Sequence, residues 1–388
     1  MKKALFRKAT AGILCLATAV SLTACNSGKQ SGGGTGTIKI GVITPLTGAN
    51  SSFGQSAKKG VQLLEEETNK AGGINGRKVQ FLIQDDESKP STAVTVAQKF
   101  INSDKVCAIV GPLTSTCANS VAPICQRDGI PMVTGTGTNT NITKAGDFIF
   151  RTCFIDPFQG QVMAKFAFDD LHAKTAAVLY NIGDDYSKGL AQAFLDSFTS
   201  KGGKIVDKET YNTGDKDFNA QLTKIAPANP DVMFLPEYYG DVAVIAKEAR
   251  STNIKATLLG GDGWDSADLF KIGGDNVNGS YFSNHYAADD TSKEVVDYIK
   301  AFKAKYNGEV PDAMAALNYD AAKVLLQCIQ KAGSTDAAKI KNALKSYDGT
   351  VVSGHIKFNA NRDAIKAAVI IKTVDGQEKF YQKTQPDT

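Results

Sequence analysis

The chain has 388 residues, of which 42% are hydrophobic and 22% charged, a composition typical of a folded globular protein. Its formal net charge of +4 comes from four N-terminal cations, Lys2, Lys3, Arg7 and Lys8, so the rest of the chain is neutral and gives no support to nucleic-acid binding. Roughly 350 residues follow the N-terminal segment, more than a typical domain of about 100 to 200, which predicts two lobes.

The first 25 residues have the pattern of an export signal. The basic residues precede an apolar run over 9–20 and the sequence Leu22-Thr23-Ala24-Cys25. The run is shorter than the roughly 20 residues that span a bilayer, and small residues before a cysteine suit a processing peptidase. The pattern resembles a bacterial lipobox, which implies a lipid on Cys25; an ordinary signal peptide with a chance cysteine is the alternative.

This segment also sets the expected location of the protein. We expect a signal peptide over 1–24 and a Gly/Ser-rich flexible tether over 25–36. No later apolar run is long enough to cross a membrane. The expected location is therefore extracytoplasmic, with the protein anchored to the cell membrane by its N-terminal lipid alone.

Beyond the tether, short apolar runs alternate with helical patterns. Each apolar run is nearly continuous, as expected of a parallel sheet covered by helices on both faces, and the alternation restarts after Arg151. Strands are predicted over 38–43, 79–84, 106–110, 176–180, 204–206, 232–235, 256–259 and 280–282, and helices over 54–71, 92–102, 115–127, 187–199, 218–225 and 242–249. The pattern predicts an α/β fold with two Rossmann-like lobes around parallel sheets.

A long helical stretch then breaks this alternation. Helices are predicted over 293–306 and 312–331 with little strand between them. A chain that returns from the second lobe to complete the first would explain the change.

Several kinds of chemistry find no support in the sequence. After Cys15 and Cys25, five cysteines remain, an odd number that cannot all pair internally, and no CxxC or Cys/His cluster suggests a metal. His172, His285 and His355 stand beside no recognisable nucleophile, and no G-x-S-x-G motif is present. We therefore expect neither an enzyme nor a cofactor.

Ligands of open parallel sheets bind at the carboxyl ends of the strands, so the loops that follow the strands are candidate sites. In the loop 111–116, Ser115 or Thr116 either caps the next helix or binds an anion such as a carboxylate. The loop 134–140 (TGTGTNT) offers backbone and hydroxyl groups but lacks the spacing of a phosphate-binding motif. Asp262, among glycines beside Trp264, belongs either to a polar turn or to a site for an ammonium group.

Aromatic residues lie in the same set of loops. Phe53, Tyr186 and the pair Tyr238-Tyr239 each suit simple packing when taken singly. Together with the polar loops they predict a cleft for a small polar molecule with an apolar tail.

Along nearly its whole length beyond the tether, the chain resembles the type I periplasmic solute-binding proteins of branched-chain amino acid transporters. The stretches that carry the resemblance are 40–48 (IGVITPLTG) with Phe53-Gly54, 71–76 (AGGING), Asp85-Asp86, 109–112 (IVGP), the loop 134–140, Phe150-Arg151 and 318–322 (NYDAA). The ordered combination is specific to this family, although no single piece is.

The resemblance implies an architecture and a mode of action. Two lobes, 37–156 plus 286–355 and 157–285 plus 356–384, would be joined by three hinge segments and close over an amino acid, which the family resemblance implies to be branched-chain. A monomer would deliver that ligand to the permease of an ABC transporter. The fold also leaves open an amide, urea or aromatic-acid ligand, or a lipoprotein that senses its ligand.

The resemblance also implies roles for individual residues. The ligand carboxylate would contact Ser115, Thr138 and the backbone of Thr136. Tyr186 and Asp262 would bind the ammonium group, although relatives often have a longer glutamate there. Two aromatic residues, Phe53 and Tyr239, would line the side-chain pocket.

Overall fold

The computed structural model describes residues 36–385, so Cys25, the expected signal peptide and nearly all of the tether lie outside the described residues. Within the described part of the chain, no helix combines the length and apolar character needed to cross a membrane. The described cysteines, Cys107, Cys117, Cys125, Cys153 and Cys328, are all free thiols.

The first sheet is parallel throughout. Its strands are β1 (Ile38–Thr44), β2 (Val79–Asp85), β3 (Ile109–Val110), β4 (Met132–Thr134) and β5 (Ile149–Arg151), in the spatial order β2-β1-β3-β4-β5. Side chains of β1 alternate between two apolar clusters, with Ile40 and Val42 on one face and Ile43 on the other. Burial on both faces explains why the predicted strands read as continuous apolar runs.

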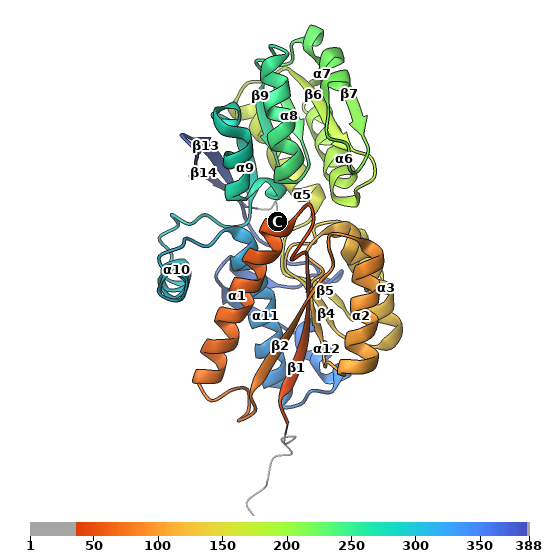
Figure 1. The fold of residues 1–388 in the computed structure, drawn as a ribbon, viewed down its shortest axis with the longest axis vertical. Coiled ribbons are helices and arrows are strands. Elements are labelled where there is room, and N and C mark those ends of the chain that lie inside the picture. Colours follow the sequence, from red (N-terminus) through yellow and green to blue (C-terminus); the bar gives the residue numbers. More distant parts are fainter. Residues whose placement is uncertain (1–35, 386–388) are drawn as a thin grey trace, which may run out of the picture. The chain divides into compact units, whose positions relative to one another are not determined.

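Helices cover both faces of this sheet (Figure 1). On one face lie α1 (Ser51–Lys70) and α11 (Ala313–Ala332), and on the other lie α2 (Pro90–Lys99) and α3 (Ser115–Asp128). A Cβ on Gly60 of α1 would stand 2.1 Å from the carbonyl oxygen of Ala315, so a glycine is needed where α1 and α11 approach each other.

The second sheet is mixed, and in this it differs from the wholly parallel sheet that the sequence pattern predicts. β6 (Thr175–Asn181), β7 (Lys204–Tyr211), β8 (Val232–Leu235), β9 (Thr257–Gly260) and β10 (Tyr281–Asn284) are parallel. The hairpin of β13 (Ala368–Val374) and β14 (Gln377–Thr384) joins β10 in antiparallel orientation. Its two-residue turn uses Asp375 and Gly376, both at positive φ.

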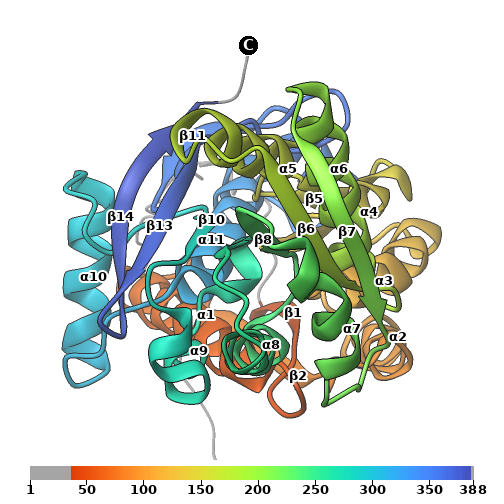
Figure 2. The ribbon, with the colours of Figure 1, turned by 90° about the horizontal axis from the view of Figure 1, so that it is seen from above.

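Two groups of helices flank the second sheet (Figure 2). One face carries α5 (Asp156–Lys165) and α6 (Asp185–Ser200). The other carries α7 (Asn219–Ile225), α8 (Tyr239–Ser251) and α9 (Ala267–Gly273). Helices therefore cover both faces of each sheet, and the two lobes have the same layered architecture.

Within residues 36–385, the chain passes between the two sheets three times. It leaves the first sheet after β5, returns after β10 to form α10 (Lys293–Lys305), α11, α12 (Ala337–Lys345) and the hairpin β11–β12 (Asp348–Val351, Gly354–Lys357), and leaves again to β13. The unbroken helical stretch in the sequence is thus the return to the first sheet. The first and third passages are joined by the buried ion pair of Arg151 Nε and Asp363 Oδ1, 2.5 Å apart.

Candidate ligand-binding site

A small cavity lies where loops from both sheets meet. Phe53, Leu113, Ser115, Thr136 and Met314 line it from elements of the first sheet, and Tyr186, Tyr238, Asp262 and Gly263 line it from the second. Its volume is about 10 Å³, which is close to the space of one water molecule. The two walls are therefore in near contact, and a ligand larger than a water molecule needs them to separate before it can enter.

Five of the seven ligand residues expected from the sequence line this cavity: Phe53, Ser115, Thr136, Tyr186 and Asp262. Thr138 does not line it, and its carbonyl oxygen accepts a hydrogen bond from the N–H of Asp156 at 3.1 Å. The Thr138 hydroxyl is buried without a hydrogen-bond partner. A ligand role for Thr138 stays a prediction.

Tyr239 also lies outside the lining, where its neighbour Tyr238 is found instead. The Tyr239 hydroxyl donates to the carbonyl oxygen of Ala49 at 3.1 Å and accepts from the N–H of Ser52 at 3.3 Å, and its ring packs on Phe53 at a centroid distance of 4.9 Å. Tyr239 thus ties α8 to the loop before α1. The sequence offered both tyrosines, but helix α8 begins at Tyr239, and only the helix start decides which ring faces the cavity.

The Ser115 side of the cavity suits an anion. Ser115 is the first residue of α3 and is buried, and its hydroxyl accepts from the N–H of Asn139 at 3.2 Å. The N-cap residue Thr114 makes no side-chain capping bond, and Thr116 donates to Asp184 at 2.7 Å. Neither Ser115 nor Thr116 caps the helix, so the capping alternative is wrong, and the N-terminal end of α3 faces the cavity with its positive dipole.

The Asp262 side suits a cation. Asp262 begins the short 3-10 helix η4 (Asp262–Trp264) directly after β9 and is 3% exposed. Its Oδ2 lies 3.0 Å from Nε2 of His285, whereas its Oδ1 is buried without a hydrogen-bond partner. Tyr186 holds the same turn, because its hydroxyl accepts from the N–H of Gly263 at 3.1 Å. A buried carboxylate oxygen without a donor can accept a hydrogen bond from an ammonium group.

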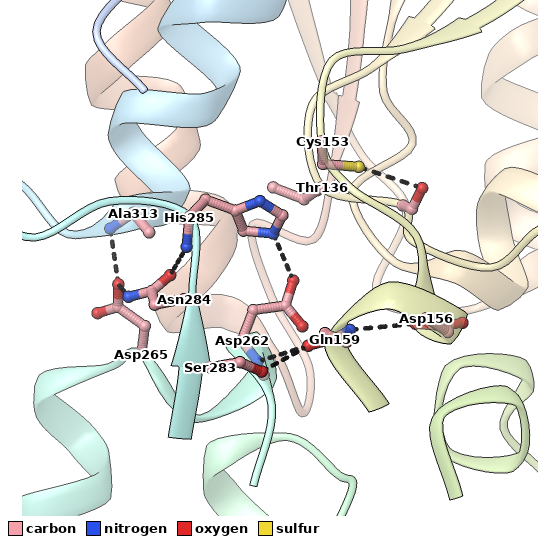
Figure 3. A network of polar contacts seen from close by, with 12 residues as sticks. Thr136, Cys153, Asp156, Gln159, Asp262, Asp265, Ser283, Asn284, His285 and Ala313 are labelled. Atoms are coloured by element: carbon pink, nitrogen blue, oxygen red, sulfur yellow. Dashed lines mark hydrogen bonds and ion pairs between the residues drawn. The ribbon is translucent and has the colours of Figure 1, made fainter. Parts of the chain in front are cut away.

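His285, which the sequence analysis did not single out as a ligand residue, does not line the cavity but contacts Asp262. Figure 3 shows its ring directed at the Asp262 carboxylate. The ring stacks on Phe154 at a centroid distance of 3.5 Å, and burial lowers the pKa of His285 to about 4. His285 is therefore neutral near pH 7, and the geometry assigns its proton to Nε2, which donates to Asp262. A signal was present, since His285 follows β10 as Asp262 follows β9, and these two strands are neighbours.

Two other residues of this turn are structural. Trp264 is fully buried and donates from its indole nitrogen to the carbonyl oxygen of Leu235 at 3.0 Å. Asp265 accepts from Asn284 and from the N–H of Ala313, each at 2.8 Å, and so fixes the start of α11 (Figure 3). The turn thus combines a packing role at Trp264 with a polar role at Asp262.

The chain is similar to known binding proteins. A family model described as periplasmic binding protein matches residues 37–378. The Leu/Ile/Val-binding protein homolog 3 of Brucella melitensis is 36% identical over 316 residues, which cover 80% of this chain and 83% of the relative.

Two solved structures are similar along their whole length. The leucine-binding protein LivK of Thermotoga maritima superposes with a TM-score of 0.86 at 36% identity, covering 90% of this chain and 99% of that one. The branched-chain amino acid transporter substrate-binding protein LivJ of Streptococcus pneumoniae, in complex with isoleucine, has a TM-score of 0.85 at 30% identity, covering 90% and 100%.

Proposed function

Because the chain belongs to the periplasmic binding protein family, we propose that it captures leucine, isoleucine or valine and delivers the amino acid to the permease of an ABC transporter. One observation carries the proposal. Ser115 at the start of α3 and Asp262, whose Oδ1 is buried without a hydrogen-bond partner, line the same cavity from the two lobes. An anion site facing a cation site is the arrangement that complements the carboxylate and ammonium groups of an amino acid.

Each charged group of the ligand has proposed partners. The carboxylate contacts the Ser115 hydroxyl, the first N–H groups of α3, the backbone of Thr136 and the hydroxyl of Thr138. The Thr136 hydroxyl donates to the carbonyl oxygen of Leu113 at 2.7 Å, which holds the Thr136 backbone next to the Ser115 loop. The ammonium group contacts Asp262 Oδ1 and the Tyr186 hydroxyl.

The apolar side chain of the ligand requires a separate wall. The apolar surface of the cavity comes from Phe53, Leu113, Met314 and Tyr238. The ring of Tyr239 packs against that of Phe53. A surface of this kind suits an aliphatic side chain. It supports leucine, isoleucine or valine over a more polar amino acid.

Binding proceeds by opening and closure of the two lobes, for which we propose the boundaries 37–156 plus 286–355 and 157–285 plus 356–384. Direct contacts hold the walls together, among them Thr116 to Asp184 at 2.7 Å and Asn119 to Asp185 at 2.8 Å. A ligand that contacts both walls stabilises the closed state, because it binds that state better than the open one. The same proposal includes a monomer held at the extracytoplasmic face of the membrane by a lipid on Cys25.

Isothermal titration with leucine, isoleucine, valine, isobutyramide and benzoate tests the ligand class. We expect heats of binding only with the amino acids, because isobutyramide and benzoate bring no ammonium group to Asp262 and leave its buried oxygen without a partner. Binding of isobutyramide or benzoate in preference to the three amino acids would contradict the proposal.

A further inference from the structure

His285 contacts a residue of the ligand cavity without lining the cavity itself. Its Nε2 lies 3.0 Å from Oδ2 of Asp262. Asp262 lines the cavity, whereas His285 does not. An effect of His285 on a ligand in this cavity would therefore pass through the Asp262 carboxylate.

The backbone of the turn that carries Asp262 is held by other groups. The Asp262 N–H donates to Oε1 of Gln159 at 3.4 Å, and the same oxygen accepts from the Ser283 hydroxyl at 3.0 Å (Figure 3). The N–H of Gly263 donates to the Tyr186 hydroxyl at 3.1 Å. These bonds fix the place of the turn, but they do not fix the rotation of the Asp262 carboxylate about its Cβ–Cγ bond.

That rotation is restricted by His285. The Cβ–Cγ torsion of an aspartate has only a broad, two-fold preference, so a carboxylate turns readily unless a hydrogen bond holds it. Because Nε2 of His285 donates to Oδ2, one orientation of the Asp262 carboxylate is selected. Oδ1 has no hydrogen-bond partner among the described residues. The two oxygens of Asp262 therefore differ, since one has a partner within the protein and the other does not.

The ring of His285 is itself held in place. Its side chain is fully buried, and it stacks on Phe154 with a centroid distance of 3.5 Å and an interplanar angle of 20°. Phe154 follows β5 and His285 follows β10, so the stacked pair joins two of the passages between the sheets. A buried and stacked ring directs its Nε2–H along one line.

The hydrogen-bond donor that faces Asp262 is uncharged. Burial lowers the pKa of His285 to about 4, so the imidazole is neutral at pH 7. A lysine or arginine could also donate to Oδ2, but its positive charge would offset the negative charge of the carboxylate. A neutral imidazole gives Oδ2 a partner and leaves that negative charge available to an ammonium group.

We propose that His285 is a positioning residue for the ammonium group of the ligand, because it binds Oδ2 of Asp262 and so directs Oδ1 toward the amino acid. This inference rests on the proposed function, in which Asp262 is the partner of the ammonium group. It gives His285 an effect on ligand affinity that is separate from its effect on folding stability.

A double-mutant cycle on leucine binding tests this role, with dissociation constants measured by isothermal titration. We expect His285→Phe, which keeps a flat ring but has no donor, to weaken leucine binding about tenfold. His285→Gln should weaken it less than about threefold, because its amide can donate to Oδ2. In an Asp262→Ala background, His285→Phe should have no further effect, because the carboxylate that His285 positions is gone.

Two further variants complete the design. His355→Phe makes the same substitution at an exposed histidine and should bind leucine as the unchanged protein does. The melting temperature of each variant shows whether it is folded during the titration. If His285→Phe is unfolded, His285→Leu, which also lacks a donor, takes its place in the cycle.

The outcomes separate this inference from the proposed function. Losses of equal size with and without the Asp262 side chain would overturn the positioning role, because they would indicate a general disturbance of the fold. If Asp262→Ala weakens leucine binding and His285→Phe does not, the proposed function stands and the positioning role fails. If no amino acid binds the unchanged protein, the proposed function fails and the role of His285 fails with it.

Discussion

Replacing His285 with phenylalanine removes the hydrogen-bond donor at the buried carboxylate of Asp262. Phenylalanine retains a flat ring that can stack on Phe154 as the imidazole does, so the loss is chiefly one hydrogen bond to a charged group. Such a bond contributes about 1.5–3 kcal/mol. We expect His285→Phe to lower the free energy of unfolding at pH 7 by this amount.

The size of this loss should depend on pH. In the folded state burial lowers the pKa of His285 to about 4, from the ordinary value of 6.5. Below pH 6.5 the unfolded chain therefore binds a proton at this histidine that the folded chain does not, and the unchanged protein loses stability as the pH falls. The loss amounts to about 2 kcal/mol between pH 7 and 5, and about 3 kcal/mol by pH 4. His285→Phe has no titratable side chain at this position and does not lose this stability. The unchanged protein and His285→Phe should therefore become similar in free energy of unfolding as the pH falls toward 5.

Urea unfolding at pH 7, 6 and 5 measures the difference, with the fluorescence of Trp264 as the signal, since it is the single tryptophan of the chain. His285→Gln is the matched control, because its amide can donate to Asp262 but does not titrate. It should lose less stability than His285→Phe at pH 7. A stability gap between the unchanged protein and His285→Phe that stays constant or widens as the pH falls would refute this account of the pair.

Two further predictions concern the ligand site and the packing of the first lobe. Asp262→Ala should weaken leucine binding by roughly 10- to 150-fold and Ser115→Ala by only a few-fold, because only the first removes the charge partner of a desolvated ammonium group. Isothermal titration measures the dissociation constants of both variants. Equal and negligible effects of the two substitutions would contradict the site assignment. Gly60→Ala should destabilise the protein by about 1–3 kcal/mol, because the new Cβ would meet the carbonyl oxygen of Ala315. Gly240→Ala, whose Cβ meets nothing within 4 Å, should unfold at nearly the original temperature.

The strands and helices of the repeating units could be predicted because each strand is buried on both faces. Continuous apolar runs such as 38–43 leave little choice of secondary structure. The hairpins were not predicted. In β14 most residues are exposed or half-buried and many are charged, so its sequence reads as a loop, and its strand conformation depends on pairing with β13.

The candidate site could be predicted as a set of loops but not as a set of contacts. Strand ends locate Ser115, Thr136 and Asp262 on general grounds, since parallel strands present their following loops at one edge. The pairing of Asp262 with His285 depends on β9 and β10 being neighbours, which is a matter of strand order. The sequence analysis expected Tyr239 in the cavity, where the structure has Tyr238. Which of the two rings lies there depends on the residue at which α8 begins, and sequence patterns do not locate a helix start to within one residue.

The free cysteines give the folded chain a chemical property of its own. Burial raises the pKa of each of the five described thiols to about 12. Because the thiolate is the form that reacts with oxidants and alkylating agents, residues 36–385 of the folded chain present almost no reactive sulfur at neutral pH. An unfolded copy exposes these five thiols, so in an oxidising compartment it can form mispaired disulfides, which the folded chain with its buried thiols does not form.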